Sequence, residues 1–197
     1  RLPGLWIQNI IYPGGADELL FFRPSTAGLR AGTHDKSADT VHGDEFVKDP
    51  IAGWTATLGR GTDAGAVFLC DYNYLRWTYN AIGVDTTEWF YDRVRLRPGS
   101  EWETSVRMVP LRGFSQVNHA SSNVIAGVQP EIDGQELKLR YSMQLPEGAS
   151  IPVGIRAQVK WPEGSTAAST TMSVGSTKAT HNALSLPDAP TDSEVVV

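Results

Sequence analysis

The sequence predicts an all-β protein, and three observations lead to that prediction. Apolar and polar residues alternate with a period of two in several runs, as in strands that are buried on one face. Almost no stretch keeps the 3.6-residue period of an amphipathic helix. The chain also holds 19 glycines and 12 prolines, which separate the alternating runs at roughly hairpin spacing. Stacked antiparallel sheets are therefore the expected architecture.

The clearest alternating runs are residues 137–145 and 151–161, in which Leu, Ile, Val, Tyr and Met occupy every second position. The link between them, residues 146–150, carries turn-forming residues. These runs are therefore expected to form either a hairpin or a crossing between two sheets. Shorter runs predict further strands at residues 5–12, 18–23, 53–58, 66–72, 86–96, 101–111, 123–130, 168–174, 180–186 and 194–197.

A change in composition near residue 115 predicts two domains. Sixteen of the eighteen Phe, Trp and Tyr residues precede this point, and only Tyr141 and Trp161 follow it. We therefore expect a large β-sandwich over residues 1–115 and a smaller β domain over residues 116–197. The second domain has the strand number and size of an immunoglobulin-like sandwich. Because the chain ends within a Val-rich strand, we expect this domain to be truncated.

The bulk properties exclude some classes of partner. A net charge of −5 and a pI near 5.3 argue against binding to nucleic acid. The apolar runs are too short to span a membrane. Cys70 is the single cysteine, so no internal disulfide is possible, and it is expected to pack as a small buried hydrophobe. Because the chain begins at Arg1, we expect a mature or excised piece of a longer protein.

Residues 71–93 combine aromatic and charged side chains, and this block supplies the candidate binding residues. The rings either fill the core of a sandwich or form a platform on which sugars stack. The platform interpretation selects four rings and four charged residues: Tyr72, Tyr74, Trp77 and Trp89 with Asp71, Arg76, Glu88 and Asp92. In an alternative, Glu88 with Asp71 or Asp92 forms the carboxyl pair of a glycosidase. In the structural interpretation these carboxylates bind arginine, such as Arg76, or the backbone.

Two further segments have candidate roles. Arginines at 93, 95 and 97 precede the turn at residues 98–100, and glutamates follow at 101 and 103. A hairpin there would place the arginines opposite the glutamates across its strands. The result would be either a solvent-facing surface whose charges neutralise each other or an electropositive stripe that binds an acidic sugar. Residues 34–45 hold two His and four carboxylates, which predict an ordinary surface loop or a calcium-binding loop. No motif for a catalytic nucleophile, phosphate binding or a Cys/His metal site is present.

The aromatic block, together with the strand-and-turn pattern of residues 67–75 and 96–102, resembles the galactose-mutarotase-like supersandwich modules of secreted bacterial proteins of polysaccharide metabolism. The resemblance covers about residues 1–115. It implies an antiparallel supersandwich, an extracellular setting and a carbohydrate ligand. The family uses a His and a Glu in catalysis, but the only similar Asn-His segment, Asn118-His119, follows the block instead of preceding it. The resemblance therefore assigns no catalytic residue.

Together these features predict a non-catalytic accessory module of a secreted or cell-surface protein that binds a polysaccharide or oligosaccharide. No cofactor is expected, apart from the calcium alternative. Two other functions stay open. One is a fragment of a carbohydrate-active enzyme, and the other is a structural subunit of an extracellular fibre or surface layer, joined to its neighbours through exposed strand edges.

Overall fold

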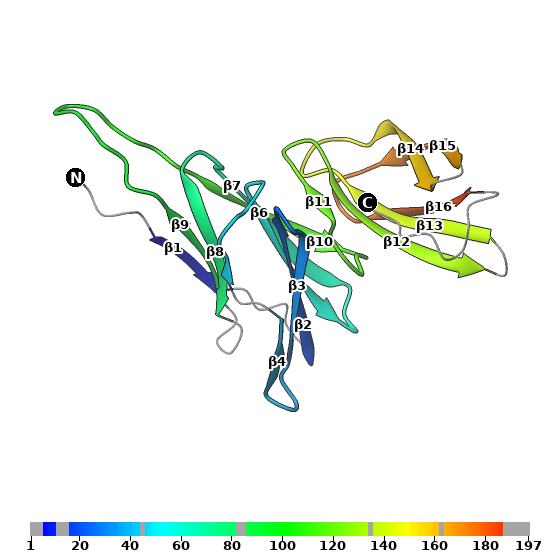
Figure 1. Cartoon of the computed structure of the whole chain (residues 1–197), viewed down its shortest axis with the longest axis horizontal. Helices are drawn as coiled ribbons and strands as arrows, with labels where there is room; N and C mark the ends of the chain where they lie inside the picture. Colours follow the sequence, from blue (N-terminus) through cyan, green and yellow to red (C-terminus); the bar gives the residue numbers. More distant parts are fainter. Residues whose placement is uncertain are drawn as a thin grey trace. The chain divides into compact units, whose positions relative to one another are not determined.

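The computed structural model confirms the all-β prediction. It describes residues 6–10, 16–43, 46–81, 86–133, 136–161 and 164–186. Within these ranges the regular elements are all strands, and every pairing for which a register is defined is antiparallel (Figure 1). The described part of the chain contains no helix with the length and apolar character needed to cross a membrane.

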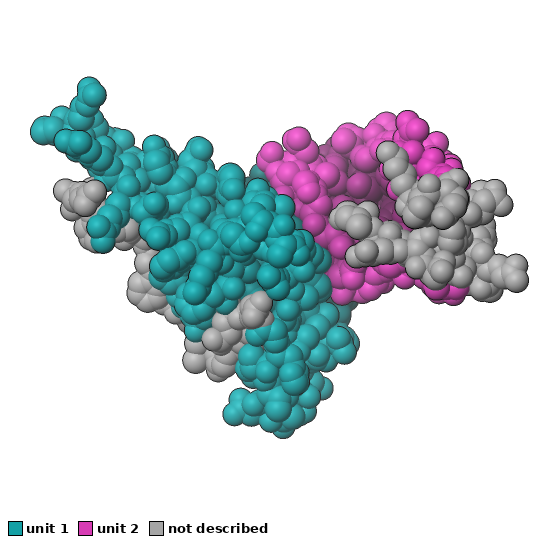
Figure 2. Space-filling model, in the orientation of Figure 1, with its two compact units in different colours: residues 1–111 teal, residues 112–197 magenta. Residues whose placement is uncertain are grey.

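The chain divides into two compact units, Arg1–Leu111 and Arg112–Val197, which Figure 2 distinguishes by colour. The sequence placed the boundary nearby, after residue 115. The change in composition coincides with a change of core. The aromatic residues of the first unit pack against one another, and the Ser/Thr/Val-rich second unit has a separate hydrophobic core.

The first unit contains two sheets. The four-stranded sheet has the strand order β1 (Trp6–Ile10), β9 (Thr86–Tyr91), β8 (Leu75–Ala81), β5 (Phe46–Val47). The six-stranded sheet has the strand order β10 (Val106–Arg112), β7 (Ala64–Cys70), β6 (Trp54–Arg60), β2 (Glu18–Ser25), β3 (Gly28–Asp35), β4 (Thr40–His42). Phe68 of β7 and Trp89 of β9 pack against each other with ring centroids 5.3 Å apart, which joins the two sheets through a shared core. The face of the four-stranded sheet that holds Trp89 is therefore its inner face.

Residues 92–105 correct one expectation. They leave β9 as an extended arm that turns back to β10, and Figure 1 shows the arm in green beyond the sheets. The turn forms as predicted, with the Ser100 N–H donating to the Arg97 carbonyl oxygen at 3.0 Å. The predicted strand pairing does not form, because β9 and β10 belong to different sheets. Within the described chain, no ion pair joins the three arginines of the arm to Glu101 or Glu103.

The second unit also contains two sheets. One sheet has four strands in the order β11 (His119–Ala120), β12 (Ile125–Asp133), β13 (Glu136–Gln144), β16 (Thr180–Leu186). The other sheet has two strands, β14 (Ile151–Trp161) and β15 (Gly164–Val174). The link at residues 146–150 is therefore a crossing between sheets, since β13 pairs with β12 and β16 while β14 pairs with β15. The predicted strand at residues 194–197 lies outside the described residues.

Candidate functional site

Four aromatic rings form a row on the outer face of the four-stranded sheet, the face opposite Trp89. Trp77 and Phe90 are register partners on β8 and β9, with ring centroids 6.0 Å apart. Phe46 of β5 and Tyr79 of β8 are also register partners, and their rings stack at 4.1 Å. Three of the rings are half-buried, and Phe46 is 44% exposed. We call Phe46, Trp77, Tyr79 and Phe90 the aromatic row.

A β-bulge at one end of this row brings Arg76 over Trp77. Leu75 pairs with Tyr91 and Trp77 pairs with Phe90, so Arg76 is the additional residue of the bulge. Its guanidinium carbon lies 4.9 Å from the centre of the Trp77 ring, and its Nη1 lies 3.4 Å from Oδ1 of Asp92. The bulge therefore places a cation, an aromatic ring and a carboxylate side by side at the solvent surface.

Asp92 is held in its charged form. The backbone N–H of Arg93 donates to its Oδ1 at 2.7 Å, and this hydrogen bond, together with the charge of Arg76, lowers the pKa of Asp92 below its usual value. Arg76 and Asp92 are both about half exposed, so the pair remains open to a ligand from solvent.

Tyr72 and Tyr74 lie in the connection between β7 and β8, and both are well exposed, at 50% and 57%. The Tyr72 hydroxyl donates to the Pro50 carbonyl oxygen at 2.9 Å. Tyr74 has a φ of +64°, an uncommon backbone conformation for a bulky residue, and its ring stands edge-on to Trp102 at 6.2 Å. Both rings are thus fixed in place while remaining open to solvent.

Two of the residues expected in the site are buried. Trp89 is fully buried in the core of the first unit, so it offers no ring to a ligand, which corrects its place among the candidate residues. Glu88 lies on the same sheet face as the aromatic row but is only 6% exposed, and its Oε1 accepts a hydrogen bond from the Thr86 hydroxyl at 3.2 Å. Strand alternation explains why Trp89 is buried, because successive side chains of a strand point to opposite faces and the adjacent Phe90 faces outward.

The three candidate carboxylates, Glu88, Asp92 and Asp71, have different surroundings. Glu88 and Asp92 are four residues apart along an extended segment, which separates their backbones by about 13 Å. Glycosidase carboxyl groups lie about 5–9.5 Å apart. Asp71 accepts a hydrogen bond from the Asn73 backbone N–H at 2.9 Å and so stabilises the turn before β8. Of the eight candidate residues, the structure brings Arg76 into contact with both Trp77 and Asp92.

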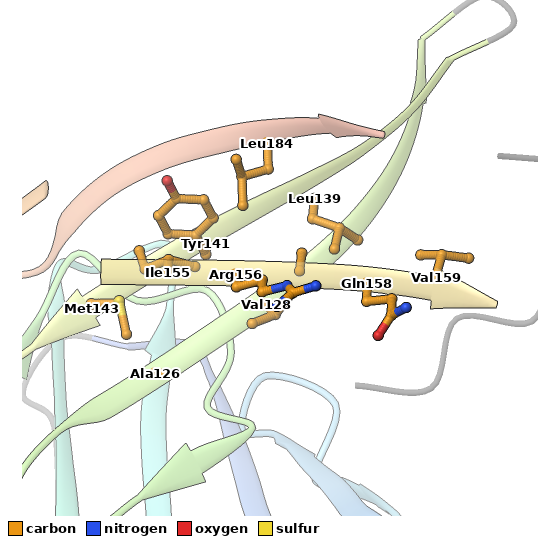
Figure 3. A pocket seen from close by; sticks show the side chains of 11 residues that line it. Ala126, Val128, Leu139, Tyr141, Met143, Ile155, Arg156, Gln158, Val159 and Leu184 are labelled. Carbon is orange, nitrogen blue, oxygen red and sulfur yellow. The ribbon is translucent and has the colours of Figure 1, made fainter. Parts of the chain in front are cut away.

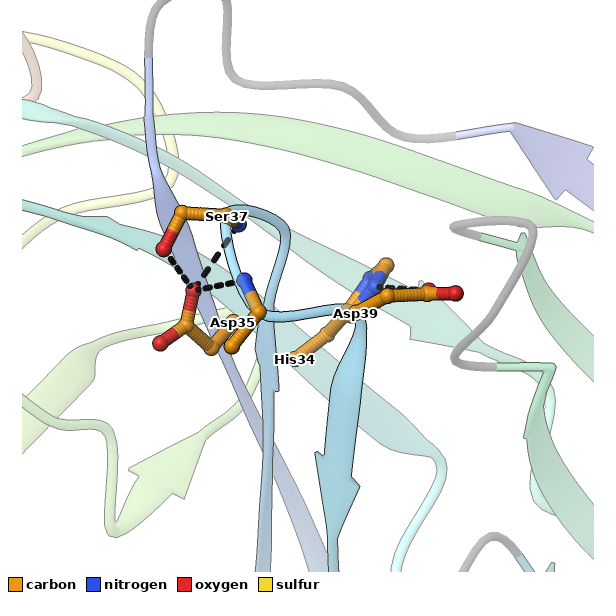
Figure 4. Close-up of polar contacts among 5 residues, drawn as sticks. His34, Asp35, Ser37 and Asp39 are labelled. Carbon is orange, nitrogen blue, oxygen red and sulfur yellow. Dashed lines mark hydrogen bonds and ion pairs between the residues drawn. The ribbon is translucent and has the colours of Figure 1, made fainter.

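The predicted loop at residues 34–45 contains the β3–β4 hairpin (Figure 4). Oδ1 of Asp35 accepts hydrogen bonds from the Ser37 N–H and hydroxyl and from the Ala38 N–H, and the bond from the Ser37 hydroxyl is the main reason that the pKa of Asp35 is lowered. Asp39 lies 3.8 Å from the His34 ring. Among the described residues no cluster of three or more potential metal ligands occurs, while residues 44 and 45 of this loop lie outside the described ranges.

The second unit has a polar depression on the outer face of β12, β13 and β16, with a volume of about 560 Å³. Oγ of Ser142 lies 2.9 Å from Nδ1 of His181, and Arg140 pairs with Glu131. A Ser–His pair forms part of a nucleophilic triad in hydrolases, where a carboxylate orients the His. Among the described residues no carboxylate bonds to His181, so none of them supplies the orienting group.

Sequence reasoning missed three members of the aromatic row. Tyr79 and Phe90 lay within the aromatic block but were not selected, although strand alternation would have placed them beside Trp77. Phe46 had no comparable signal, because it belongs to the two-residue strand β5, which is too short to show a period.

Comparisons of the chain with protein-family models, with curated proteins and with solved structures found no match.

Proposed function

We propose that this chain is a non-catalytic carbohydrate-binding or accessory module of a secreted or cell-surface protein. In this proposal the aromatic row contacts a polysaccharide or oligosaccharide, and Arg76 and Asp92 bond to its hydroxyl groups. The resemblance of residues 1–115 to galactose-mutarotase-like supersandwich modules belongs to the same proposal.

The observation that carries the proposal is the row of four rings on one solvent-facing sheet surface. Aromatic rings combine a large apolar area with little conformational freedom, so they suit the flat apolar faces of sugar rings. Phe46 is the most exposed of the four, and its stacking on Tyr79 holds it parallel to a neighbouring ring. The adjacent Arg76 and Asp92 supply charged donors and acceptors, which make the stronger hydrogen bonds.

The test is binding to a panel of soluble polysaccharides, measured by affinity electrophoresis and calorimetry. Trp77→Ala and Phe46→Ala are each expected to weaken binding about tenfold, equivalent to about 1.4 kcal/mol. Met108→Ala is the matched control, because Met108 is 59% exposed on β10 and lies in the other sheet. Equal weakening by all three variants, or by none of them, contradicts the proposal.

A structural role is the second candidate function, and one observation favours it. Strand β14 of the second unit pairs with β15, and among the described strands it has no partner on its other side. Open strand edges can join subunits in fibres or layers. Sedimentation of the purified chain over a range of concentrations tests this role, because a fibre subunit self-associates and a binding module does not.

A further inference from the structure

Three arginines lie on the outgoing leg of the arm that connects β9 to β10, at positions 93, 95 and 97. All three are exposed, and Figure 1 shows the arm extending away from the sheets of the first unit. In an extended segment, alternate side chains point to the same side and are about 6.6–6.8 Å apart along the chain. The leg therefore presents three cations in a row. We call Arg93, Arg95 and Arg97 the arginine line.

The turn at the tip of the arm keeps the arginine line away from the glutamates of the returning leg. Pro98 and Gly99 are its central residues, and the φ of +78° at Gly99 is typical of a type II turn. Type II turns splay the two segments that they join, whereas paired hairpin strands use type I′ or II′ turns. Because the Ser100 N–H donates to the Arg97 carbonyl oxygen, the turn also sets which positions of the two legs lie opposite each other. The positions opposite the arginine line hold Ser100, Trp102 and Thr104, none of which is acidic.

The arginine line has no ion-pair partner in the part of the chain that the structure describes. Arg60 pairs with Glu18 and Arg76 pairs with Asp92, but no described carboxylate pairs with position 93, 95 or 97. The chain as a whole has a net charge of −5, so this excess of positive charge is local. Like charges at this spacing repel one another, and an anion bound along the line would relieve that repulsion.

The chemistry of arginine indicates the kind of anion. Guanidinium groups bind carboxylates and sulfates through two parallel hydrogen bonds, and such charge-assisted bonds are strong. A small anion engages one arginine at a time. A polymer that carries acidic groups at intervals engages all three, so a linear polyanion fits the line best.

The position of the arginine line connects it to the aromatic row. The arm starts at Asp92, whose partner Arg76 lies over Trp77 of the row. The pKa of Asp92 is lowered chiefly by the hydrogen bond from the Arg93 N–H, and also by the charges of Arg76 and Arg93. A ligand that contacts Asp92 is therefore close to the first member of the line. This continuity favours a glycan as the polyanion.

We propose that the arginine line binds the carboxylate or sulfate groups of an acidic polysaccharide. This inference rests on the proposed function, and it specifies the class of polysaccharide. Binding by the line is electrostatic, so it should weaken as the salt concentration rises, whereas stacking on the aromatic row should respond much less to salt.

The experiment is calorimetric titration of the intact chain with polygalacturonate, dextran sulfate and unsubstituted dextran, in buffer free of divalent cations. We expect the chain to bind at least one of the two acidic polymers about tenfold more tightly than dextran, because only they offer partners for charge-assisted bonds. The two acidic polymers distinguish carboxylate from sulfate as the preferred group.

The triple variant Arg93→Gln, Arg95→Gln, Arg97→Gln is expected to bind the acidic polymer about tenfold more weakly or less, with unchanged affinity for neutral glycans. Its unfolding in urea should match that of the unaltered chain, since the three side chains are exposed and form no ion pair with the described residues.

The matched control is the triple variant Arg60→Gln, Arg140→Gln, Arg156→Gln. It removes the same charge from three exposed arginines on other strands. Arg156 borders an apolar groove of about 260 Å³ in the second unit and is the one cation among the described residues that line it (Figure 3). The control variant should keep the affinity of the unaltered chain for the acidic polymers.

Several results would overturn the proposal. These are no binding to either acidic polymer, equal affinity for dextran and the acidic polymers, and equal weakening by the two triple variants. Equally tight binding of a DNA duplex would also overturn it, because the line would then attract any polyanion. If the acidic polymer binds the arm variant normally but binds Trp77→Ala weakly, this inference fails and the proposed function stands. If the reverse is found, the arginine line binds without the aromatic row and the proposed role of the row fails.

Discussion

The guanidinium carbon of Arg76 lies 4.9 Å from the centre of the Trp77 ring, at a bulge in β8 where Nη1 of Arg76 also meets Asp92 at 3.4 Å. The contact with the ring and the hydrogen bond to the carboxylate both restrict the guanidinium. This arrangement links the rings of the proposed binding surface to a charged donor of restricted orientation.

We expect Arg76→Lys to weaken glycan binding severalfold without loss of stability. Lysine keeps the charge but cannot stack its flat face or present a fork of donors. The Arg76–Asp92 pair is exposed, and exposed pairs contribute about 0–1 kcal/mol to stability. Calorimetric titration and urea unfolding measure the two effects.

The control for this variant is Arg60→Lys, since Arg60 is exposed and forms an ion pair with Glu18 at 3.1 Å on the other sheet. Unchanged binding in Arg76→Lys, or the same loss in Arg60→Lys, would remove Arg76 from the binding surface.

Trp89→Ala is expected to destabilise the first unit by about 3–5 kcal/mol, the usual cost of removing a large buried aromatic side chain. Trp77→Ala should cost much less, because Trp77 lies on the solvent-facing side of the same sheet and is only half-buried. Urea unfolding followed by circular dichroism compares the two variants. If the two free energies of unfolding fall by the same amount, the assignment of inner and outer faces is wrong.

Replacing Gly127 or Gly154 by alanine should change the stability of the second unit differently. A Cβ at Gly127 would lie 2.2 Å from the backbone oxygen of Gln116, so Gly127→Ala forces that segment away from β12 and should cost about 1–3 kcal/mol. A Cβ at Gly154 meets no atom within 4 Å, so Gly154→Ala should be neutral or stabilise by about 0.4–1 kcal/mol. Thermal unfolding of the second unit distinguishes them, and a more stable Gly127→Ala variant would show that the Gln116 segment does not cross β12 closely.

Cys70 should react slowly with thiol reagents in the folded protein. Burial beside Tyr91 raises the pKa of the Cys70 thiol to about 12, and only the thiolate is nucleophilic. Because the shift is upward, native reactivity should stay low at pH 8 and rise only as the pH approaches 12. In denaturant, reaction should begin near the usual thiol pKa of about 8.5. Rapid alkylation of the native protein at pH 8 would contradict the burial of this side chain.

Much of the fold could be predicted because long strands carry their own signal. Residues 151–161 and 180–186 alternate clearly, and they form β14 and β16 with those bounds. Residues 93–103 show the limit of this reasoning. Their alternation is real, since the arginines are exposed and Val94, Leu96 and Trp102 are partly covered. However, a period of two does not specify a partner strand, and the neighbouring strands β9 and β10 join different sheets.

The candidate site was harder to predict for a related physical reason. Alternation separated Trp89 from Phe90, but it did not determine which of the two faces the core. That choice depends on the position of Phe68 in another sheet, which is information distant in the sequence. The contact between Arg76 and Trp77 depends on a bulge, and a single additional residue in one strand has no recognisable signature in this segment.

The most direct test of the proposed function is a glycan-array screen of the intact chain, run with and without calcium. We predict binding to one class of oligosaccharide or polysaccharide, with at least a tenfold lower signal for the double variant Phe46→Ala, Trp77→Ala at the same folded concentration. Absence of binding to every glycan in both conditions, or an undiminished signal from the double variant, would contradict the role of the aromatic row.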